Sequence, residues 1–461
     1  MFNFVLNKHK YKNIHFIGIG GISMSGLAKI VFSEGYTVSG SDLKKGDITV
    51  GLEKIGIKVF YGHSPENIKD ADLVIYTDAV NIDNVELKAA INKKIDVIDR
   101  TSFLNAIMNN YEISIAVSGT HGKTTTTSIL SEIILNLDSN PTILLGGQLD
   151  HIHGNAKFGD KKIFLTEACE YKANILKYFP TTAIVLNIDE DHLDYFDNID
   201  HIIKTFKAYV NNLGPSDKLI LNIDDENSKS LLEADNTNII TISAEKKANY
   251  TARNITKDDC GHPVFDVYHN DEFMFNIKLE ILGYHNVYNS LAAIAAASEN
   301  GIEQKDIIQG LKSYKGVHRR LEKKGMYNGA KVIDDYAHHP TEIKASLQAI
   351  RNSAKNKLYC VFQPHTFTRT KLLLDSFANS FVDADKIIIT DIYAAREKDY
   401  GDIHSKTLCN SIVANGKDAI YIEKFDDIVE FLKENLNEND TVITMGAGDV
   451  YKVGEQLIKY N

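Results

Sequence analysis

The sequence predicts an α/β protein of three domains, in which a central domain with a phosphate-binding loop lies between two Rossmann-like domains. A glycine-rich turn follows the first short strand, a second glycine loop stands near residue 119, and strand–loop–helix units repeat after residue 316. A chain of 461 residues is also too long for one ordinary core. We place the domains at 1–110, 111–315 and 316–461.

Composition excludes several classes of protein. The net charge of −11 argues against a broad nucleic-acid-binding surface, which needs clustered Lys and Arg. No stretch approaches the apolar length of a membrane span. The four cysteines, Cys169, Cys260, Cys360 and Cys409, form no CxxC pair, which predicts reduced thiols rather than a disulfide frame or a zinc site. We therefore expect a cytoplasmic protein with no nucleic-acid and no membrane partner.

The first domain opens with a βαβ unit that carries a glycine turn. Ser23 stands where the strict dinucleotide pattern has its third glycine, so the turn predicts a diphosphate pocket and supports NAD only weakly. Asp42 follows the second strand and is either a ligand of a ribose hydroxyl or an exposed acid. The expected elements are a strand at 13–16, the turn at 18–26, a helix to Glu34, and strands at 36–39 and 71–76.

A phosphate-binding loop opens the central domain. An apolar strand at 113–117 leads into GTHGKTT, and a helix follows. The two glycines allow a tight turn whose N–H groups point at one anion, and the helix adds its positive N-terminal end. Val117 stands where the full pattern has a glycine, so the loop has a shorter form. The candidate phosphate ligands are Gly119, Thr120, His121, Gly122, Lys123, Thr124 and Thr125.

Two further strands of the central domain end in acidic segments. The strand at 162–166 is followed by Glu167, and the strand at 182–188 runs into DEDHLDYF, which contains His192. A magnesium ion bound to the phosphates would take ligands from the loop and from the strand ends beside it. The candidate magnesium ligands are Thr124, Glu167 and His192. The simpler alternatives are a solvated strand end for Glu167 and a structural hydrogen bond for His192.

The rest of the central domain is expected to be β-rich and then helical. Residues 250–282 alternate loosely between apolar and polar, which predicts antiparallel strands. An alanine-rich helix follows GYHNVYNS. Asn289 lies near its start and is either a helix cap or the amide that an adenine edge requires.

The third domain repeats strand, loop and helix, which is typical of an open parallel sheet. Strands are expected at 330–334, 357–362, 386–390 and 441–445, with helices at 342–351 and 371–381. Such sheets bind ligands at the carboxyl ends of their strands. The charged and imidazole side chains of these loops, and of the segment before them, are Arg320, Asp335, His338, His339, His365, Arg369, Arg396 and Asp449.

Nine motifs occur in order across almost the whole chain and together resemble the Mur ligase family. They are HFIGIGGISMSGLA, GTHGKTTT, TEACEY, NIDEDHLDYF, YHNVYNSLAA, GVHRRLE, VIDDYAHHP, FQPHTFTRT and MGAGD. Within the family they resemble the branch that joins L-alanine to UDP-N-acetylmuramate. The resemblance implies that ATP phosphorylates the lactoyl carboxylate of the sugar nucleotide. The amine of alanine then attacks the acyl phosphate, and phosphate leaves. It also implies two magnesium ions, and we expect a monomer or a weak homodimer.

The resemblance also assigns roles to individual residues. Lys123 would hold the β- and γ-phosphates, Thr124 and Glu167 one magnesium, and His192 a second. Asn289 would contact adenine, Arg320 phosphate and Asp335 ribose, while His338, His365 and Arg369 would line the end where alanine and the acyl phosphate meet. The catalytic set is Lys123, His192, Arg320, His338, His365 and Arg369. The sugar-nucleotide set is Gly18, Gly20, Gly21, Ile22, Ser23, Met24, Ser25 and Asp42.

The chain departs from the family pattern at three points. Ser23 replaces a usual glycine, and Thr366 stands where many members have arginine. Phe206 aligns with a lysine that is carbamylated in other branches, and neither Lys204 nor Lys207 is assigned that role. The alternatives are a ligase that recycles a preformed tripeptide onto the same sugar nucleotide, an NAD-binding oxidoreductase, and a non-catalytic nucleotide sensor. We further predict that ATP closes the central and third domains.

Overall fold

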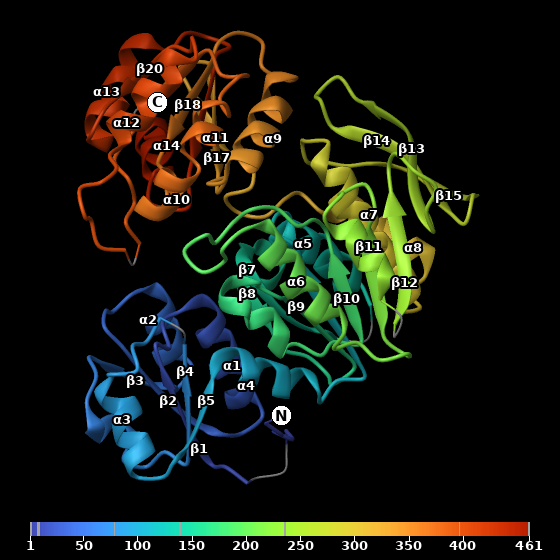
Figure 1. Ribbon diagram of the computed structural model, residues 1–461, viewed down its shortest axis with the longest axis vertical. Coiled ribbons are helices and arrows are strands. Elements are labelled where there is room, and N and C mark those ends of the chain that lie inside the picture. The colour runs from blue at the N-terminus through green and yellow to red at the C-terminus, as the bar shows by residue number, and fades with distance from the viewer. Residues whose placement is uncertain are drawn as a thin grey trace.

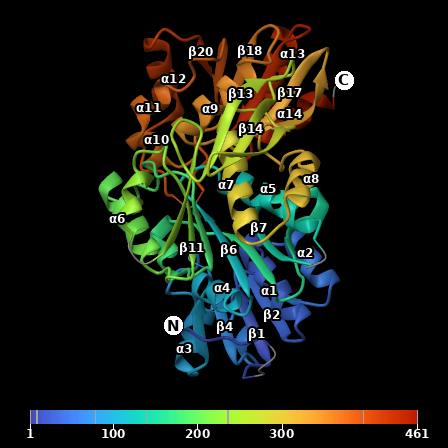
Figure 2. The ribbon, with the colours of Figure 1, turned by 90° about the vertical axis from the view of Figure 1, so that its right-hand side faces the viewer.

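The computed structural model describes residues 2–6, 10–77, 79–137, 140–234, 237–395 and 397–459. It contains three β-sheets that follow one another along the chain, each flanked by helices (Figures 1 and 2). The first sheet lies at the bottom of Figure 1 and the third at the top, with the central sheet between them. The predicted three-domain α/β architecture is therefore confirmed.

The first sheet is parallel throughout and has the order β3-β2-β1-β4-β5. The strand NIHFI is buried along almost its whole length, as expected for a parallel strand covered on both faces. β3 and β5 were not predicted from the sequence, because KVFY and DVID are short and mix polar with apolar residues. The strands are β1 (Asn13–Ile17), β2 (Thr37–Asp42), β3 (Lys58–Tyr61), β4 (Leu73–Tyr76) and β5 (Asp96–Asp99). The helices are α1 (Ile22–Ser33), α2 (Asp47–Lys54), η1 (Pro65–Ile68), α3 (Val85–Asn92) and α4 (Arg100–Met108).

The central sheet has ten strands in the order β15-β14-β13-β12-β11-β10-β6-β9-β7-β8. Its middle is parallel, and antiparallel hairpins extend both edges. The predicted strand at 182–188 is shorter than expected, because the chain leaves the sheet after Val185 to form the acidic loop. The strands are β6 (Ile113–Ser118), β7 (Thr142–Leu149), β8 (Gly154–Lys157), β9 (Ile163–Glu167), β10 (Thr182–Val185), β11 (Lys218–Asn222), β12 (Asn238–Ser243), β13 (Tyr250–Lys257), β14 (Pro263–His269) and β15 (Glu272–Lys278). The helices are α5 (Lys123–Leu135), η2 (Asp150–Ile152), η3 (Tyr171–Lys177), α6 (Ile199–Val210), η4 (Ser228–Glu233), α7 (His285–Glu299) and α8 (Gln304–Ser313).

The third sheet has the order β16-β17-β21-β18-β19-β20 and is parallel apart from β16. The predicted single helix at 371–381 is wrong, because two short helices meet at Leu373, whose backbone is not helical. The strands are β16 (Glu322–Tyr327), β17 (Ala330–Asp335), β18 (Leu358–Phe362), β19 (Lys386–Ile389), β20 (Ala419–Tyr421) and β21 (Thr441–Met445). The helices are α9 (Pro340–Arg351), α10 (Phe367–Leu372), α11 (Leu374–Ala378), α12 (Ser405–Ala414), α13 (Phe425–Asn435) and α14 (Tyr451–Ile458).

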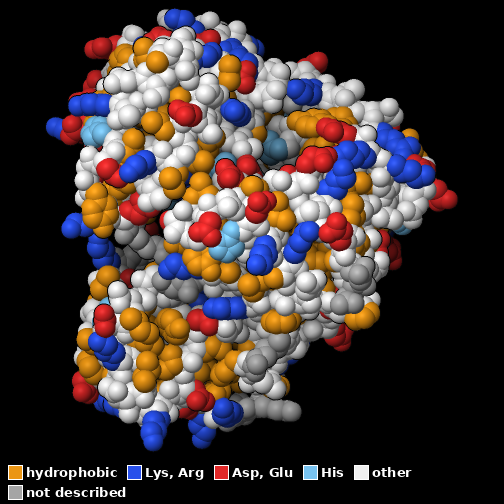
Figure 3. Space-filling view, viewed as in Figure 1, with side chains coloured by type: hydrophobic (Ala, Val, Ile, Leu, Met, Phe, Trp, Pro, Cys, Tyr) orange, Lys and Arg blue, Asp and Glu red, His pale blue; other side chains and the backbone are white. Residues whose placement is uncertain are grey.

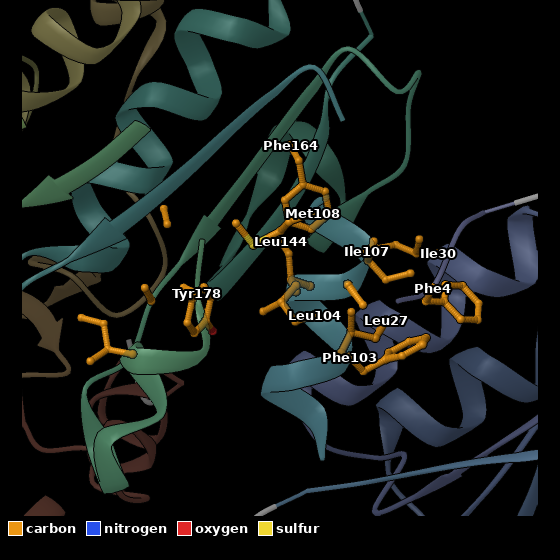
Figure 4. Close-up of a cluster of buried hydrophobic side chains, with 14 of the residues drawn as sticks. Phe4, Leu27, Ile30, Phe103, Leu104, Ile107, Met108, Leu144, Phe164 and Tyr178 are labelled. Atoms are coloured by element: carbon orange, nitrogen blue, oxygen red, sulfur yellow. The ribbon is translucent and has the colours of Figure 1, made fainter. Parts of the chain in front are cut away.

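A continuous apolar cluster joins the first domain to the central one (Figure 4). Leu27 of α1 and Leu104 of α4 belong to the same buried cluster as Leu144 of β7 and Phe164 of β9. The packing is close, since a Cβ atom at Gly26 would lie 2.3 Å from a methyl carbon of Leu144. This shared core fixes the glycine turn of the first domain beside the central sheet.

The surface carries no obvious single-sign field on the face shown in Figure 3, where basic and acidic side chains are interspersed. Within the described parts of the chain, no helix is long and apolar enough to cross a membrane.

Candidate functional site

The phosphate-binding loop connects β6 to α5 and has the backbone geometry that its glycines predict. Gly119 and Gly122 both have positive φ angles, +128° and +85°. Asn187 holds the loop from the neighbouring strand end. Its side chain accepts from the backbone N–H of His121 at 2.8 Å and donates to the His121 carbonyl at 3.1 Å. The loop is thus preshaped, with its N–H groups at the positive end of α5.

Lys123 is held by a buried carboxylate that the sequence analysis did not single out. Its Nζ donates to the carbonyl oxygen of Thr120 at 3.0 Å and lies 3.1 Å from Oε2 of Glu170. Only 17% of the Lys123 side chain and 3% of the Glu170 side chain are exposed. Burial opposes the charge on Lys123, but the neighbouring Glu170 outweighs it and raises the pKa of the ammonium group. Lys123 therefore stays protonated beside the loop.

Three of the candidate metal ligands and Glu170 lie around the same loop. The Thr124 hydroxyl donates to Oε2 of Glu167 at 3.1 Å, and the other oxygen of Glu167 accepts from the Gly146 N–H at 2.7 Å. Nε2 of His192 lies 3.6 Å from Oε1 of Glu170. A hydroxyl and two carboxylates are the oxygen donors that Mg²⁺ prefers, so this donor set fits the ion that the motifs imply. His192 would contribute one nitrogen.

A cavity of about 910 Å³ lies between the phosphate loop and the third domain. It brings together candidates that are far apart in sequence, namely Thr125, Asn289, Arg320 and Asp335. Its size is at the upper end of the range usual for small-molecule sites. Other lining residues include Asn222 at the end of β11, Asp225 and Asn227 in the loop after it, and His285 of α7.

Two of these candidates are already engaged within the protein. The side-chain NH2 group of Asn289 donates to the side-chain oxygen of Asn286 at 2.8 Å. The side-chain oxygen of Asn289 accepts from the Thr126 hydroxyl at 3.2 Å. Asp335 is buried and accepts from the backbone N–H groups of Ala337 at 2.6 Å and Leu321 at 3.0 Å. Burial raises the pKa of Asp335 to about 6. Both side chains shape the wall of the cavity.

Arg320 reaches the cavity from the segment that links the central and third domains. Its guanidinium lies over the ring of Tyr336, 5.2 Å from the ring centroid. Asp335 anchors the next residue of the segment, Leu321, through its backbone. The charge of Arg320 therefore faces the same cavity as the phosphate loop.

His121 links the phosphate loop to the third domain through two carboxylates. Its Nε2 lies 3.0 Å from Asp189, and its Nδ1 lies 3.3 Å from Glu342 of α9. Burial alone would lower its pKa, but hydrogen bonds with the two carboxylates outweigh burial and raise the pKa of His121 to about 9. His339 adds a second link, because its Nε2 lies 2.8 Å from the Glu190 carbonyl oxygen.

Arg369, His192 and His365 line a second, smaller cavity. Arg369 donates from Nε and Nη2 to one oxygen of Asp191 at 3.0 and 2.8 Å, across the domain boundary. The charges of His192 and Arg369 lower the pKa of Asp191 despite its burial. His365 lies 3.0 Å from Arg369, and the His338 ring lies 5.5 Å from the His365 ring. The cavity, about 180 Å³, is lined by residues that include Asp191, His192, His365, Thr366, Arg369 and Glu397.

Burial keeps His338 neutral, since it lowers the pKa of the imidazole to about 4.

Thr366 has a local role that explains a hydroxyl at this position. Its side chain caps α10 by accepting from the backbone N–H of Arg369 at 3.4 Å. It thereby positions the helix that carries Arg369.

Five other residues that the sequence analysis discussed either line neither cavity or lie outside the described residues. Asp449 is half exposed and pairs with Lys452 at 3.3 Å, and Arg396 lies outside the described residues. Phe206 is fully buried in α6. Lys204 is exposed, and Lys207 pairs with Glu233 at 3.2 Å on the surface. Neither lysine lines either cavity.

The glycine turn of the first domain lines neither of these two cavities. Gly18 has a positive φ of +83°, and the N–H of Gly20 donates to Asp42 at 2.9 Å. Asp42 therefore braces the turn. Ser23 and Ile22 stand at the N-terminus of α1, where Ser23 accepts from Arg100 at 3.2 Å. Gly21 caps this helix, whose first turn also contains the buried Met24 and Ser25.

The site residues that the sequence analysis missed are the acidic partners of the candidate cations. Glu170, Asp189, Asp191 and Glu342 were not selected, although all four stand inside or beside the motifs. The excess of acids in TEACEY and DEDHLD was the available signal, but sequence does not show which acid meets which cation.

Comparison with known proteins covers nearly the whole chain. Three family models match consecutive segments, described as Mur ligase family, catalytic domain (13–112), Mur ligase middle domain (117–297), and Mur ligase, glutamate ligase domain (319–448). A UDP-N-acetylmuramate–L-alanine ligase of Acetivibrio thermocellus is 52% identical over 99% of this chain and 97% of its own length.

Two solved structures are similar over almost their whole length. The UDP-N-acetylmuramate–alanine ligase of Thermotoga maritima has a TM-score of 0.81 and 30% identity, covering 98% of this chain and 99% of that one. A murein peptide ligase of Psychrobacter arcticus has a TM-score of 0.73 and 25% identity, covering 97% and 98%.

Proposed function

The chain belongs to the Mur ligase family, and we propose that it uses ATP to join L-alanine to the lactoyl carboxylate of UDP-N-acetylmuramate. The observation that carries this proposal is a pair of cavities, of which one is lined by the phosphate loop and the other by His192, whose Nε2 lies 3.6 Å from the Glu170 partner of Lys123. The larger cavity is wide enough for a nucleotide. The smaller cavity lies between Arg369 of the third domain and His192 of the central domain.

Joining an amine to a carboxylate requires the carboxylate to gain a leaving group. We propose that the γ-phosphoryl group of ATP is transferred to the lactoyl carboxylate, giving an acyl phosphate. The amine of alanine then attacks its carbonyl carbon, and phosphate departs with the bonding electrons. The protein's part is positioning and neutralisation of negative charge.

Each side of the site would contribute to this neutralisation. Lys123 and the loop N–H groups would hold the outer phosphates, and Arg320 would add a charge from the opposite wall of the cavity. Thr124, Glu167 and His192 would hold magnesium, which neutralises phosphate charge when bound. Of the described residues, Glu170 is a further carboxylate within reach of His192.

The smaller cavity is the proposed meeting place of alanine and the acyl phosphate. Arg369 and His365 lie on its third-domain side, and His192 on its central side. The glycine turn at Gly18–Ser25 would hold the uridine diphosphate at the N-terminus of α1. The shared apolar core of the first two domains would fix the distance between these two sites.

Phosphate release is the direct test of this function. With UDP-N-acetylmuramate, ATP, magnesium and L-alanine present, we expect release that falls to background when any one of the three substrates is omitted. Release with the tripeptide L-alanyl-γ-D-glutamyl-diaminopimelate and none with alanine would instead assign the recycling activity. Release that does not depend on the sugar nucleotide would refute the proposal.

The relatives favour alanine over the tripeptide. The Acetivibrio protein, which is 52% identical over 97% of its length, is named UDP-N-acetylmuramate–L-alanine ligase. The murein peptide ligase structure is 25% identical. The match of the first domain to a Mur ligase model also leaves the NAD hypothesis without support. We retain as proposals the domain bounds 1–110, 111–315 and 316–461, two magnesium ions, a cytoplasmic location, and a monomer or weak homodimer.

A further inference from the structure

Three metal-binding side chains meet on the turn between β13 and β14, away from the phosphate loop. Asp258, Cys260 and His262 each offer one ligand atom, and these atoms lie within 4.8 Å of one another. We propose that this turn binds a thiophilic divalent cation such as Zn²⁺, at a site separate from the magnesium ligands. The proposal does not depend on the ligase function.

The turn is built so that alternate side chains face the same point. One oxygen of Asp258 accepts from the backbone N–H groups of Cys260 and His262, both at 2.9 Å. The backbone N–H of Asp258 donates to the His262 carbonyl at 3.0 Å, and Gly261 supplies the positive φ of +89° that closes the turn. Residues 258, 260 and 262 are thereby held on one side.

Two of the three ligand atoms already have the separation that a metal requires. Oδ2 of Asp258 and Nδ1 of His262 are 3.2 Å apart. Two ligands of a tetrahedral zinc ion with bonds of about 2.0–2.1 Å would be about 3.3 Å apart. Cys260 is exposed at the tip of the turn, so its thiol has room to rotate toward the other two.

The chemistry of the donors selects the kind of ion. A thiolate and an imidazole favour Zn²⁺ and similar ions, whereas Mg²⁺ takes oxygen ligands. The carboxylate and the thiolate together would balance the two positive charges. Metal binding would also draw the proton from the Cys260 thiol.

The neighbouring ammonium group of Lys278 would repel a bound cation, but Lys278 also has a second carboxylate partner. Nζ of Lys278 lies 3.5 Å from Asp258 but 3.3 Å from Glu280. Glu280 can therefore keep Lys278 when a metal occupies Asp258. Three protein ligands leave one position for water, and two of these ligands, Cys260 and His262, line the large cavity.

A metal site at this turn could not be predicted from the sequence. The search for zinc motifs looks for paired cysteines, and this chain has only one cysteine in the segment DDCGH. Here the spacing is Asp-x-Cys-x-His within one five-residue turn. The site is visible only because the Asp258 carboxylate folds the turn.

Cobalt titration of the full-length chain without nucleotide tests the proposal, because Co²⁺ bound to a thiolate absorbs in the near ultraviolet by charge transfer. We expect this band to appear, to saturate at one ion per chain, and to disappear when Zn²⁺ is added but not with excess Mg²⁺. Cys260→Ser should abolish the band. His262→Ala should weaken Zn²⁺ binding at least tenfold in competition with a chromophoric chelator.

Two matched variants make the result specific. Cys169→Ser removes the cysteine beside the phosphate loop, and His269→Gln removes the histidine at the end of β14; both should keep the band. A thermal melt of Cys260→Ser should match that of the unchanged chain, because the thiol is exposed. No band, a band that survives in Cys260→Ser, or a band lost only in Cys169→Ser would each overturn the proposal.

Discussion

The ion pair between Lys123 and Glu170 leads to a measurable prediction about both stability and activity. Replacement of Lys123 by Met keeps an apolar stem of similar length and removes the ammonium group. Glu170, whose side chain is 3% exposed, is then left without the cation that lies 3.1 Å away. Removing one partner of a buried ion pair typically costs about 3–5 kcal/mol. We take the lower end, about 3 kcal/mol, because His192 remains 3.6 Å from Glu170.

A double-variant cycle separates the pair from its surroundings. Glu170→Gln should also cost about 3 kcal/mol, because it leaves Lys123 buried without its counter-ion. Independent effects would sum to about 6 kcal/mol in the double variant, whereas we expect about 3 kcal/mol, a coupling of about 3 kcal/mol. Lys204→Met, on the exposed face of α6, should change stability by less than about 0.5 kcal/mol.

Amide hydrogen exchange of α5 is the suitable measurement, because a chain of three domains need not unfold in one step. The opening free energy of this helix should fall by a similar amount in each single variant and in the double variant. All variants that lack Lys123 should also lose phosphate release. Strictly additive losses, or an α5 that exchanges normally in Lys123→Met, would refute the view that Glu170 depends on Lys123 for its charge balance.

The remaining predictions concern other parts of the site. Lys123→Ala should reduce phosphate release at least 100-fold while binding of UDP-N-acetylmuramate, followed by calorimetry, persists, because the proposed sites lie on different domains; loss of that binding would count against separate sites. The pKa of His121 is raised to about 9 in the folded chain, against about 6.5 in the unfolded chain. The protonated His121 therefore stabilises the fold fully below pH 6.5, and this stabilisation is lost as pH rises to 9. His121→Gln should remove this part of the pH dependence of thermal melting, and an unchanged profile would contradict the prediction. Arg369→Lys should lose the two-pronged contact with Asp191 and give a larger radius of gyration in small-angle scattering; no expansion would show that this contact does not hold the domains together. Gly26→Val should lower stability by about 1–3 kcal/mol, because its side chain would meet Leu144, and an unchanged melting temperature would show that the interface yields.

The sequence allowed the framework of the fold to be predicted where local patterns are strong. The strand at 441–445 is found at those residues, and the phosphate loop lies between a strand and a helix as its glycines indicate. Each depends on residues that are adjacent in the chain. An apolar run reports a buried strand, and a glycine with positive φ reports a turn.

The parts that could not be predicted depend on contacts between distant segments. Asp335, expected at a ribose, lines the large cavity, and its carboxylate also accepts from two backbone N–H groups of its own domain, which the sequence did not show. Asn289 was expected at adenine, and its amide is shared between Thr126 and Asn286. The same residue types serve ligands and backbone equally well, so only the folded arrangement shows which partner lies within reach. The break of the 371–381 helix at Leu373 could not be predicted either, because no proline or glycine marks it.

The acidic segment at 189–192 explains why the two cavities meet at one place. Asp189 pairs with His121 and accepts from Thr341 of α9 at 2.7 Å, while the Glu190 carbonyl lies 2.8 Å from His339. Asp191 then binds the helix that carries Arg369, which borders the smaller cavity. The last residue of the segment, a histidine with a positive φ of +54°, turns back toward the carboxylate at the phosphate loop.

The four successive residues 189–192 therefore contact the phosphate loop, the third domain and the Glu170 carboxylate at the proposed metal site. In this structure the central and third domains are already joined by these bonds, with Arg320 and the phosphate loop facing the same cavity. Any opening of the cavity must break the contacts of this segment first. Because one of its residues also stands at the proposed magnesium site, binding of a nucleotide and docking of the third domain would stabilise the same conformation of residues 189–192. The predicted closure on ATP thus becomes a statement about one segment, whose amide exchange should slow when a non-hydrolysable ATP analogue is added.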